Sequence, residues 1–199
     1  MPNATFYFDF ASPNAYLSHR VIPAIEARTG ARFHYKPILL GGLFKLSGNQ
    51  APMTAFAGIP NKLAYEYREM ERFIARHGLT RFTMNPHFPV NTLALMRGAV
   101  AAEAQAILPA YTEAMFHYMW EDPRKLDDMA ILAATLTEAG LPTETLMARA
   151  ADPEIKAALL ANTQAAYEAG AFGIPSFLVG EELWFGKDRL GEVEEAMGG

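Results

Sequence analysis

The chain has 199 residues, a formal net charge of −5 and 51% hydrophobic residues, a composition typical of a globular protein rather than a disordered one. It contains no cysteine, which excludes disulfides, iron–sulfur clusters, thiolate zinc sites and a thiol nucleophile of its own. The balance of 17 Lys and Arg against 22 Asp and Glu argues against nucleic-acid binding.

A strand–helix–strand unit is predicted at the start of the chain. The aromatic run at residues 4–10 predicts a buried strand. Ser12 and Pro13 then supply the N-cap and the first-turn proline of a helix, which stops at Gly30. The alternating residues 32–38 predict a second strand. A βαβ unit of this length has its two strands parallel.

The middle of the chain is predominantly helical. Residues 41–50 are rich in glycine and amide side chains and are expected to form a loop. Helical spacing then recurs from about residue 60 to residue 171. The expected helices include residues 63–74 and 93–100 and span approximately 107–119, 126–139, 143–150 and 153–169.

The last thirty residues return to strands. Residues 177–179 and 183–185 predict a hairpin, and an amphipathic helix follows with Asp188 as its expected N-cap. The order is therefore βαβ, a helical insertion and ββα, which predicts an α/β fold interrupted by an all-helical part.

Other classes of function are disfavoured. The sequence has no apolar run long enough to cross a bilayer and no basic leader before an apolar stretch, so we expect no membrane association and a cytoplasmic location. Its five histidines lack metal-ligand spacing, so no metal site is predicted.

Ser12 is the first candidate for chemistry. A hydroxyl at the start of a helix lies beside the positive end of the helix dipole and beside free backbone N–H groups, which favour an anion or a thiolate. An ordinary N-cap is the alternative. A Ser-His-Asp triad with His19 and Asp9 is a weak hypothesis, because His19 follows in the same helix and no G-x-S-x-G motif is present.

Two further segments are candidates. Gly173, Ile174 and Pro175 precede a strand, and a cis bond there would leave the Ile174 backbone free to pair with an extended, peptide-like ligand. A plain strand-initiating proline is the alternative. The segment 41–50 carries one cation, Lys45, and is interpreted either as a carboxylate-binding loop or as a connector.

Together, seven motifs in chain order resemble one family of enzymes. They are Phe8-Asp9-Phe10-Ala11-Ser12-Pro13, Gly41-Gly42-Leu43-Phe44-Lys45, Ser47-Gly48-Asn49-Gln50, Pro60-Asn61-Lys62, His87-Phe88-Pro89-Val90-Asn91-Thr92-Leu93, Gly173-Ile174-Pro175-Ser176-Phe177 and Phe185-Gly186-Lys187-Asp188-Arg189-Leu190. The chain resembles the 2-hydroxychromene-2-carboxylate isomerases and the kappa-class glutathione transferases of the DsbA-related thioredoxin superfamily. The resemblance implies a thioredoxin-like domain at residues 1–45 and 166–199, with an inserted helical domain at residues 46–165.

The resemblance also implies a glutathione site. Ser12 stands where redox relatives carry the first cysteine of a CxxC motif, and its implied role is to hydrogen-bond the sulfur of glutathione and hold it as thiolate. Ile174, before an implied cis Pro175, would pair through its backbone with the cysteinyl part. The other implied contacts are Asn49 and Lys62 with the tripeptide, Asp188 and Arg189 with its γ-glutamyl end, and Lys45, His87 and Phe88 with a second substrate.

The implied reaction interconverts 2-hydroxychromene-2-carboxylate and trans-o-hydroxybenzylidenepyruvate in aromatic-compound catabolism, by reversible addition of the thiolate. A helix N-terminus supports this chemistry, because it lowers a thiol pKa from its usual value of about 8.5. Two alternatives stay open: a kappa-like transferase or peroxidase that consumes glutathione, and a non-catalytic DsbA-like binding protein. The implied partners are a small aromatic or α-keto acid substrate and a second copy in a homodimer.

Overall fold

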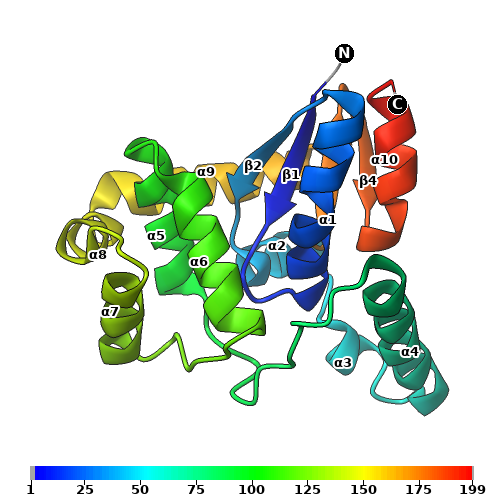
Figure 1. Ribbon diagram of the computed structural model, residues 1–199, viewed down its shortest axis with the longest axis horizontal. Coiled ribbons are helices and arrows are strands. Elements are labelled where there is room, and N and C mark those ends of the chain that lie inside the picture. The colour runs from blue at the N-terminus through cyan, green and yellow to red at the C-terminus, as the bar shows by residue number, and fades with distance from the viewer. Residues whose placement is uncertain (1–2, 199) are drawn as a thin grey trace.

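A four-stranded mixed sheet lies at the centre of the fold. The computed structural model describes residues 3–198. The strands are β1 (Ala4–Phe8), β2 (Phe33–Pro37), β3 (Ser176–Val179) and β4 (Glu182–Phe185). Their spatial order is β2-β1-β3-β4, and Figure 1 shows the parallel pair β1 and β2 beside α1. β1 and β2 are parallel, as predicted, and β3 is antiparallel to both β1 and β4.

Ten α-helices and one 3₁₀ helix accompany the sheet in residues 3–198. They are α1 (Pro13–Thr29), α2 (Leu40–Ser47), α3 (Pro52–Ala55), α4 (Pro60–His77), α5 (Leu93–Ala104), α6 (Leu108–Trp120), α7 (Met129–Glu138), α8 (Thr143–Ala150), α9 (Pro153–Glu168), η1 (Lys187–Arg189) and α10 (Leu190–Ala196). The βαβ…ββα order and the helical middle are confirmed. Within the described residues, no helix is both long and apolar enough to cross a bilayer.

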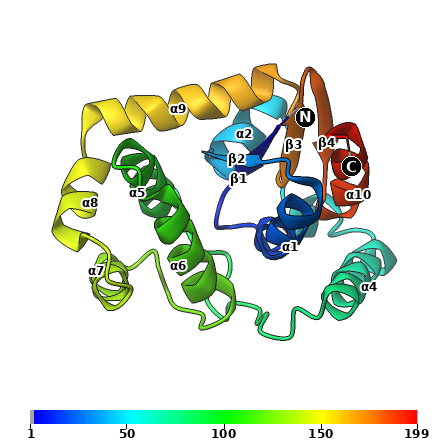
Figure 2. The ribbon, with the colours of Figure 1, turned by 45° about the horizontal axis from the view of Figure 1, so that its top comes forward.

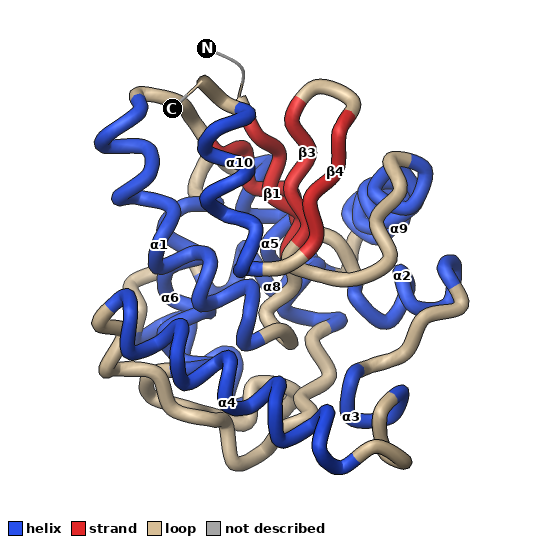
Figure 3. Tube along the Cα trace, turned by 90° about the vertical axis from the view of Figure 1, so that its right-hand side faces the viewer, coloured by secondary structure: helices blue, strands red, loops and turns tan. Residues whose placement is uncertain are grey.

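The two faces of the sheet pack against different helices, because successive side chains of a strand point to opposite faces. Phe6 and Phe8 of β1 belong to a core that includes Ile22 of α1 and Val193 of α10. Tyr7, between them, packs instead in a second apolar cluster with α2 and α9. Figure 3 shows α1 and α10 on one side of the strands and α9 on the other. Figure 2 shows α9 running along that second side, past α2.

The long first helix has the predicted ends. Ser12 is its N-cap, Pro13 occupies its first turn, and Gly30 ends it with a left-handed φ of 73°. That positive φ explains the glycine, because residues with a Cβ rarely adopt it. The result is a helix whose N-terminus directly follows the carboxyl end of the central strand β1.

Two local predictions are wrong. Residues Leu40–Ser47, expected to be loop, form the helix α2. Its first amides are capped by side chains that are distant in sequence: Thr163 Oγ1 accepts from Leu39 N at 3.0 Å, and Asp9 Oδ2 accepts from Leu40 N at 2.8 Å. Asp188 is not the N-cap of the last helix, because it lies inside η1 and α10 follows with Arg189 at its N-cap position.

Candidate functional site

Ser12 lies where β1, α1 and the segment before β3 meet. Its Oγ accepts a hydrogen bond from the backbone N–H of Ala15 at 3.2 Å, which is N-cap geometry. The same hydroxyl donates to the backbone carbonyl of Ile174 at 3.4 Å, across 162 residues of sequence. Two of the predicted site segments are therefore in direct contact.

The Ile174–Pro175 peptide bond is cis, as the resemblance implies. Both residues are buried, and the segment is held by a hydrogen bond from Ser176 Oγ to the Gly173 carbonyl at 2.8 Å. A second cis bond joins Phe88 to Pro89. The sequence analysis did not predict that one.

Two backbone amides beside Ser12 have no acceptor within residues 3–198. Asn14 N–H lies in the first turn of α1, and the carbonyl that a helix would place opposite it, Phe10 O, instead accepts from Trp120 Nε1 at 3.0 Å. The N–H of Ile174 likewise makes no hydrogen bond to any residue that the structure describes. Free N–H groups at a helix start favour an anionic atom, and a free strand-edge amide favours a peptide carbonyl. This donor set fits a thiolate carried by a peptide.

α2 leads from the sheet to Asn49. The Asn49 side-chain N–H donates to the backbone carbonyl of Phe172 at 2.8 Å, which ties the end of α2 to the segment that contains Ile174. Lys45 lies in the last turn of α2 and is exposed. The structure thus places Asn49 next to the Ile174 segment and exposes the Lys45 side chain to solvent.

Lys62 does not contact this group of residues. It lies in the first turn of the largely exposed helix α4, and its amine sits over the ring of Phe56 at 3.6 Å from the centroid. Its predicted contact with glutathione remains a prediction.

Asp188 and Arg189 lie in η1, which packs against α1. The Asp188 carboxylate is paired with the amine of Lys187 at 3.1 Å, and Arg189 with Glu192 at 2.5 Å. Lys187 is only 5% exposed and its amine faces the Phe73 ring of α4. The sequence analysis missed Lys187, because nothing in the local pattern distinguishes a buried lysine from a solvated one.

His87 and Phe88 lie between α4 and α5. His87 is exposed, and its backbone N–H is held by the side chain of Asn85 at 2.9 Å. The Phe88 ring is half-buried, and its centroid lies 6.0 Å from that of the Trp120 ring. The indole N–H of Trp120 donates to the Phe10 carbonyl. Phe88 is thereby linked to the turn that carries Ser12.

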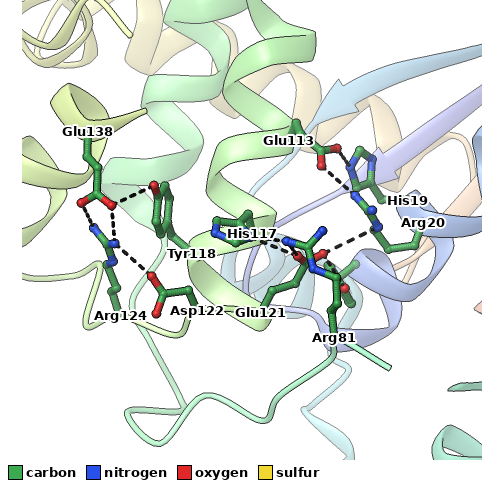
Figure 4. Close-up of polar contacts among 11 residues, drawn as sticks. His19, Arg20, Arg81, Glu113, His117, Tyr118, Glu121, Asp122, Arg124 and Glu138 are labelled. Carbon is green, nitrogen blue, oxygen red and sulfur yellow. Dashed lines mark hydrogen bonds and ion pairs between the residues drawn. The ribbon is translucent and has the colours of Figure 1, made fainter. Parts of the chain in front are cut away.

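His19 forms hydrogen bonds with Tyr35 and Glu113, which argues against a Ser12-His19-Asp9 triad. One ring nitrogen lies 2.9 Å from Tyr35 Oη. The other lies 3.0 Å from Glu113 Oε2 of α6 (Figure 4). Arg20 pairs with the other oxygen of Glu113 at 2.7 Å. These neighbours lower the pKa of the Glu113 carboxyl from 4.5 to about 2, with the His19 hydrogen bond as the largest cause.

Glu121 forms a second junction between α1 and α6. Its side chain is 3% exposed and accepts from Tyr16 Oη at 2.8 Å, while Arg81 pairs with it at 2.6 Å (Figure 4). Burial alone would raise the pKa of Glu121, but hydrogen bonds from His117 and Tyr16 and the two nearby arginines lower it below its usual value. The carboxylate therefore holds the first turn of α1 in place while remaining ionised.

The Glu113 contacts predict an acid-dependent loss of stability. Since the pKa is lowered on folding, Glu113 contributes stability above pH 4.5, and this contribution disappears as the pH falls toward 2. Because the side chain is 57% exposed, we expect about 1 kcal/mol or less. Denaturant unfolding of Glu113→Gln and the parent should give free energies that differ at neutral pH and converge in acid. Glu181→Gln, in the exposed β3–β4 turn, is the control and should show no such convergence; a constant difference for Glu113→Gln would contradict the prediction.

Comparison with known proteins decides the family. The family model for DSBA-like thioredoxin domains matches residues 4–198. The chain belongs to the DsbA-like thioredoxin family. Within this family it is 28% identical to the 2-hydroxychromene-2-carboxylate isomerase of Sphingobium xenophagum, over 95% of this chain and 94% of that protein. It is 24% identical to glutathione S-transferase kappa 1 of Rattus norvegicus, over 92% and 85% respectively.

A solved structure agrees with these matches. The structure of a 2-hydroxychromene-2-carboxylate isomerase superimposes with a TM-score of 0.81 at 26% identity, covering 98% of this chain and 94% of its own. The thioredoxin-like fold and the resemblance drawn from the motifs are thereby confirmed.

Proposed function

We propose that the protein is a glutathione-dependent isomerase that interconverts 2-hydroxychromene-2-carboxylate and trans-o-hydroxybenzylidenepyruvate, or a close analogue. The observation that carries the proposal is the contact between the Ser12 hydroxyl and the Ile174 carbonyl, beside N–H groups of Asn14 and Ile174 that have no acceptor in the described part of the chain. The relatives named as isomerases and as kappa-class transferases support it.

Each part of the site has a defined task in this proposal. When bound, glutathione supplies the thiolate that adds reversibly to a double bond of the substrate. When glutathione is bound, the Ser12 hydroxyl releases the Ile174 carbonyl and, together with the Asn14 N–H, donates to the sulfur, which lowers the proton affinity of the sulfur. The Ile174 backbone, with its carbonyl released, aligns the cysteinyl part. No base is required, since the helix N-terminus itself favours the ionised sulfur.

The remaining residues orient the two ligands. The Asp188 carboxylate and Arg189 bind the charged γ-glutamyl end, and Asn49 and Lys62 contact the rest of the tripeptide. The exposed Lys45 amine balances the substrate carboxylate and the negative charge that develops during addition. The other proposed contacts with the second substrate are His87 and Phe88.

We extend the proposal to the setting of the enzyme. It acts in aromatic-compound catabolism in the cytoplasm and assembles as a homodimer. We also keep the division into a thioredoxin-like domain at 1–45 and 166–199 and an inserted domain at 46–165. Sedimentation analysis tests the dimer.

Measuring the concentration of glutathione during turnover tests the type of reaction. We expect the pure protein to equilibrate the two substrate isomers while the concentration of glutathione stays constant. Steady loss of glutathione would instead favour the kappa-like transferase or peroxidase. A protein without turnover in which Ser12→Ala leaves glutathione affinity intact would favour the non-catalytic binding protein.

A further inference from the structure

Asp9 is a fully buried acidic residue that the proposed mechanism does not use. It lies just after β1 and three residues before Ser12, and its exposure is 0%. Within residues 3–198 it forms no ion pair with a lysine, arginine or histidine. Burying a carboxyl group without a neighbouring cation costs folding free energy unless its oxygens accept hydrogen bonds. The hydrogen-bond partners of Asp9 therefore indicate its role.

Those partners come from two separate segments. Oδ1 accepts from the backbone N–H of Ala11 at 2.9 Å, and Oδ2 accepts from the backbone N–H of Leu40 at 2.8 Å. Burial raises the pKa of the Asp9 carboxyl, while these two hydrogen bonds and the nearby Thr92 side chain oppose that rise.

The two partners and Thr92 each adjoin a segment of the proposed site. Ala11 immediately precedes Ser12. Leu40 begins α2, the helix that carries Lys45 and leads to Asn49. Thr92 directly precedes α5 and follows the segment of His87 and Phe88.

The chemistry of this position requires a carboxyl group. Two backbone N–H groups from different segments approach two oxygens of one short side chain, and only a carboxylate offers two acceptors without a donor. An amide in its place would direct its NH₂ group against one of the two N–H groups. The carboxyl also suits the start of α2, whose own N-cap, Leu39, has no side-chain acceptor.

We propose that Asp9 is a positioning residue, which holds the Ser12 turn and the start of α2 at a fixed separation so that both reach the same ligand. This inference rests on the proposed glutathione site, but it assigns a task to a residue that does not touch the ligand. Asp9 acts through the placement of Ser12, so its effect on catalysis should depend on the Ser12 hydroxyl.

A double-mutant cycle on the full chain tests this dependence. Asp9→Asn should lower kcat/KM by up to about 100-fold in the parent, because displacing a positioned group such as Ser12 by about 1 Å has an effect of that size. In the Ser12→Ala background the same change should have a much smaller effect, because interacting residues are not additive. Equal effects in both backgrounds would overturn the proposal and leave Asp9 a purely structural cap.

Two threonines extend the test. Thr92→Val removes the polar group beside Asp9 that lowers the pKa of its carboxyl. This variant should show the same dependence on Ser12 in weaker form, which keeps the proposal testable if Asp9→Asn fails to fold. Thr112→Val is the matched control, because the buried Thr112 hydroxyl has no hydrogen-bond partner in the described residues. It should leave kcat/KM unchanged. A Thr92→Val effect equal in both backgrounds would count against the proposal.

Amide hydrogen exchange on the free protein separates this proposal from the proposed function. Asp9→Asn should speed exchange at Ala11 or Leu40, and unchanged exchange at both would overturn the positioning role even in an active enzyme. A parent protein that neither binds glutathione nor isomerises substrate would overturn the proposed function, while the exchange rates would still decide whether Asp9 holds the two segments together.

Discussion

Ser12→Ala should lower the isomerisation rate by about 10-fold to about 150-fold, because a hydrogen bond to a charged group contributes about 1.5–3 kcal/mol. The substitution also removes the N-cap of α1, where Oγ accepts from Ala15 N. That loss should reduce the free energy of unfolding by about 1 kcal/mol and leave the protein folded. Steady-state kinetics and denaturant unfolding measure the two effects separately.

Two further variants separate the hydroxyl from the helix cap. Ser12→Gly also lacks the hydroxyl, but glycine is tolerated at an N-cap, so its rate should fall as far as that of Ser12→Ala with a smaller loss of stability. Ser18→Ala is the control, since Ser18 lies buried in the same helix and donates only to the Asn14 carbonyl. If Ser12→Ala and Ser12→Gly kept a rate within a few-fold of the parent, the serine would be only a cap.

Trp120→Ala should have the largest effect on stability, with a loss of about 3–5 kcal/mol in the free energy of unfolding. Trp120 is 0% exposed, packs against Phe82 and Phe88, and donates its indole N–H to the Phe10 carbonyl at 3.0 Å. The loss is a large share of the 5–15 kcal/mol that stabilises a typical domain. Thermal and denaturant unfolding provide the measurement.

Trp120→Phe tests the hydrogen bond apart from the packing. It keeps an aromatic ring but leaves the Phe10 carbonyl without its donor, which should cost about 1–3 kcal/mol. The matched control is Trp184→Phe, since Trp184 is half-buried on β4 and its indole makes no hydrogen bond in the described residues. Equal losses for the two Trp→Phe variants would contradict the role given to the Phe10 contact.

The sequence predicted those helices and strands that are determined by residues within them or directly beside them. The ends of α1 follow from Ser12, Pro13 and Gly30, and the structure has all three in those positions. The aromatic run at residues 4–10 predicted the buried strand for the same reason, because its preference for a buried strand lies in the residues of the strand itself.

Features that depend on distant residues could not be predicted from local pattern. α2 contains two glycines near its start, and the side chains that cap it come from Asp9 and Thr163, 31 and 124 residues away from the amides they bind. The pairing of Tyr16 with Glu121 spans 105 residues. No pattern within a single helix reports such contacts.

In the candidate site, too, some residues follow from local motifs and others depend on distant contacts. The motifs located Ser12, Ile174 and Pro175, and the structure brings these together through the Ser12–Ile174 hydrogen bond. The role proposed for Asp9 depends on its contacts with Ala11 and with the distant Leu40, and no local pattern predicts the second of these. Lys62 remains a prediction from resemblance, because its amine contacts Phe56.

The role proposed for Ser12 can be measured through the ionisation of bound glutathione. The ultraviolet absorbance of the thiolate, followed against pH with saturating protein, reports the pKa of the bound sulfur. For the parent we predict a value well below the pKa of about 8.5 of a free thiol, and for Ser12→Ala a value shifted back toward it. A bound sulfur that titrates like free glutathione in the parent, or identically in both proteins, would contradict the account.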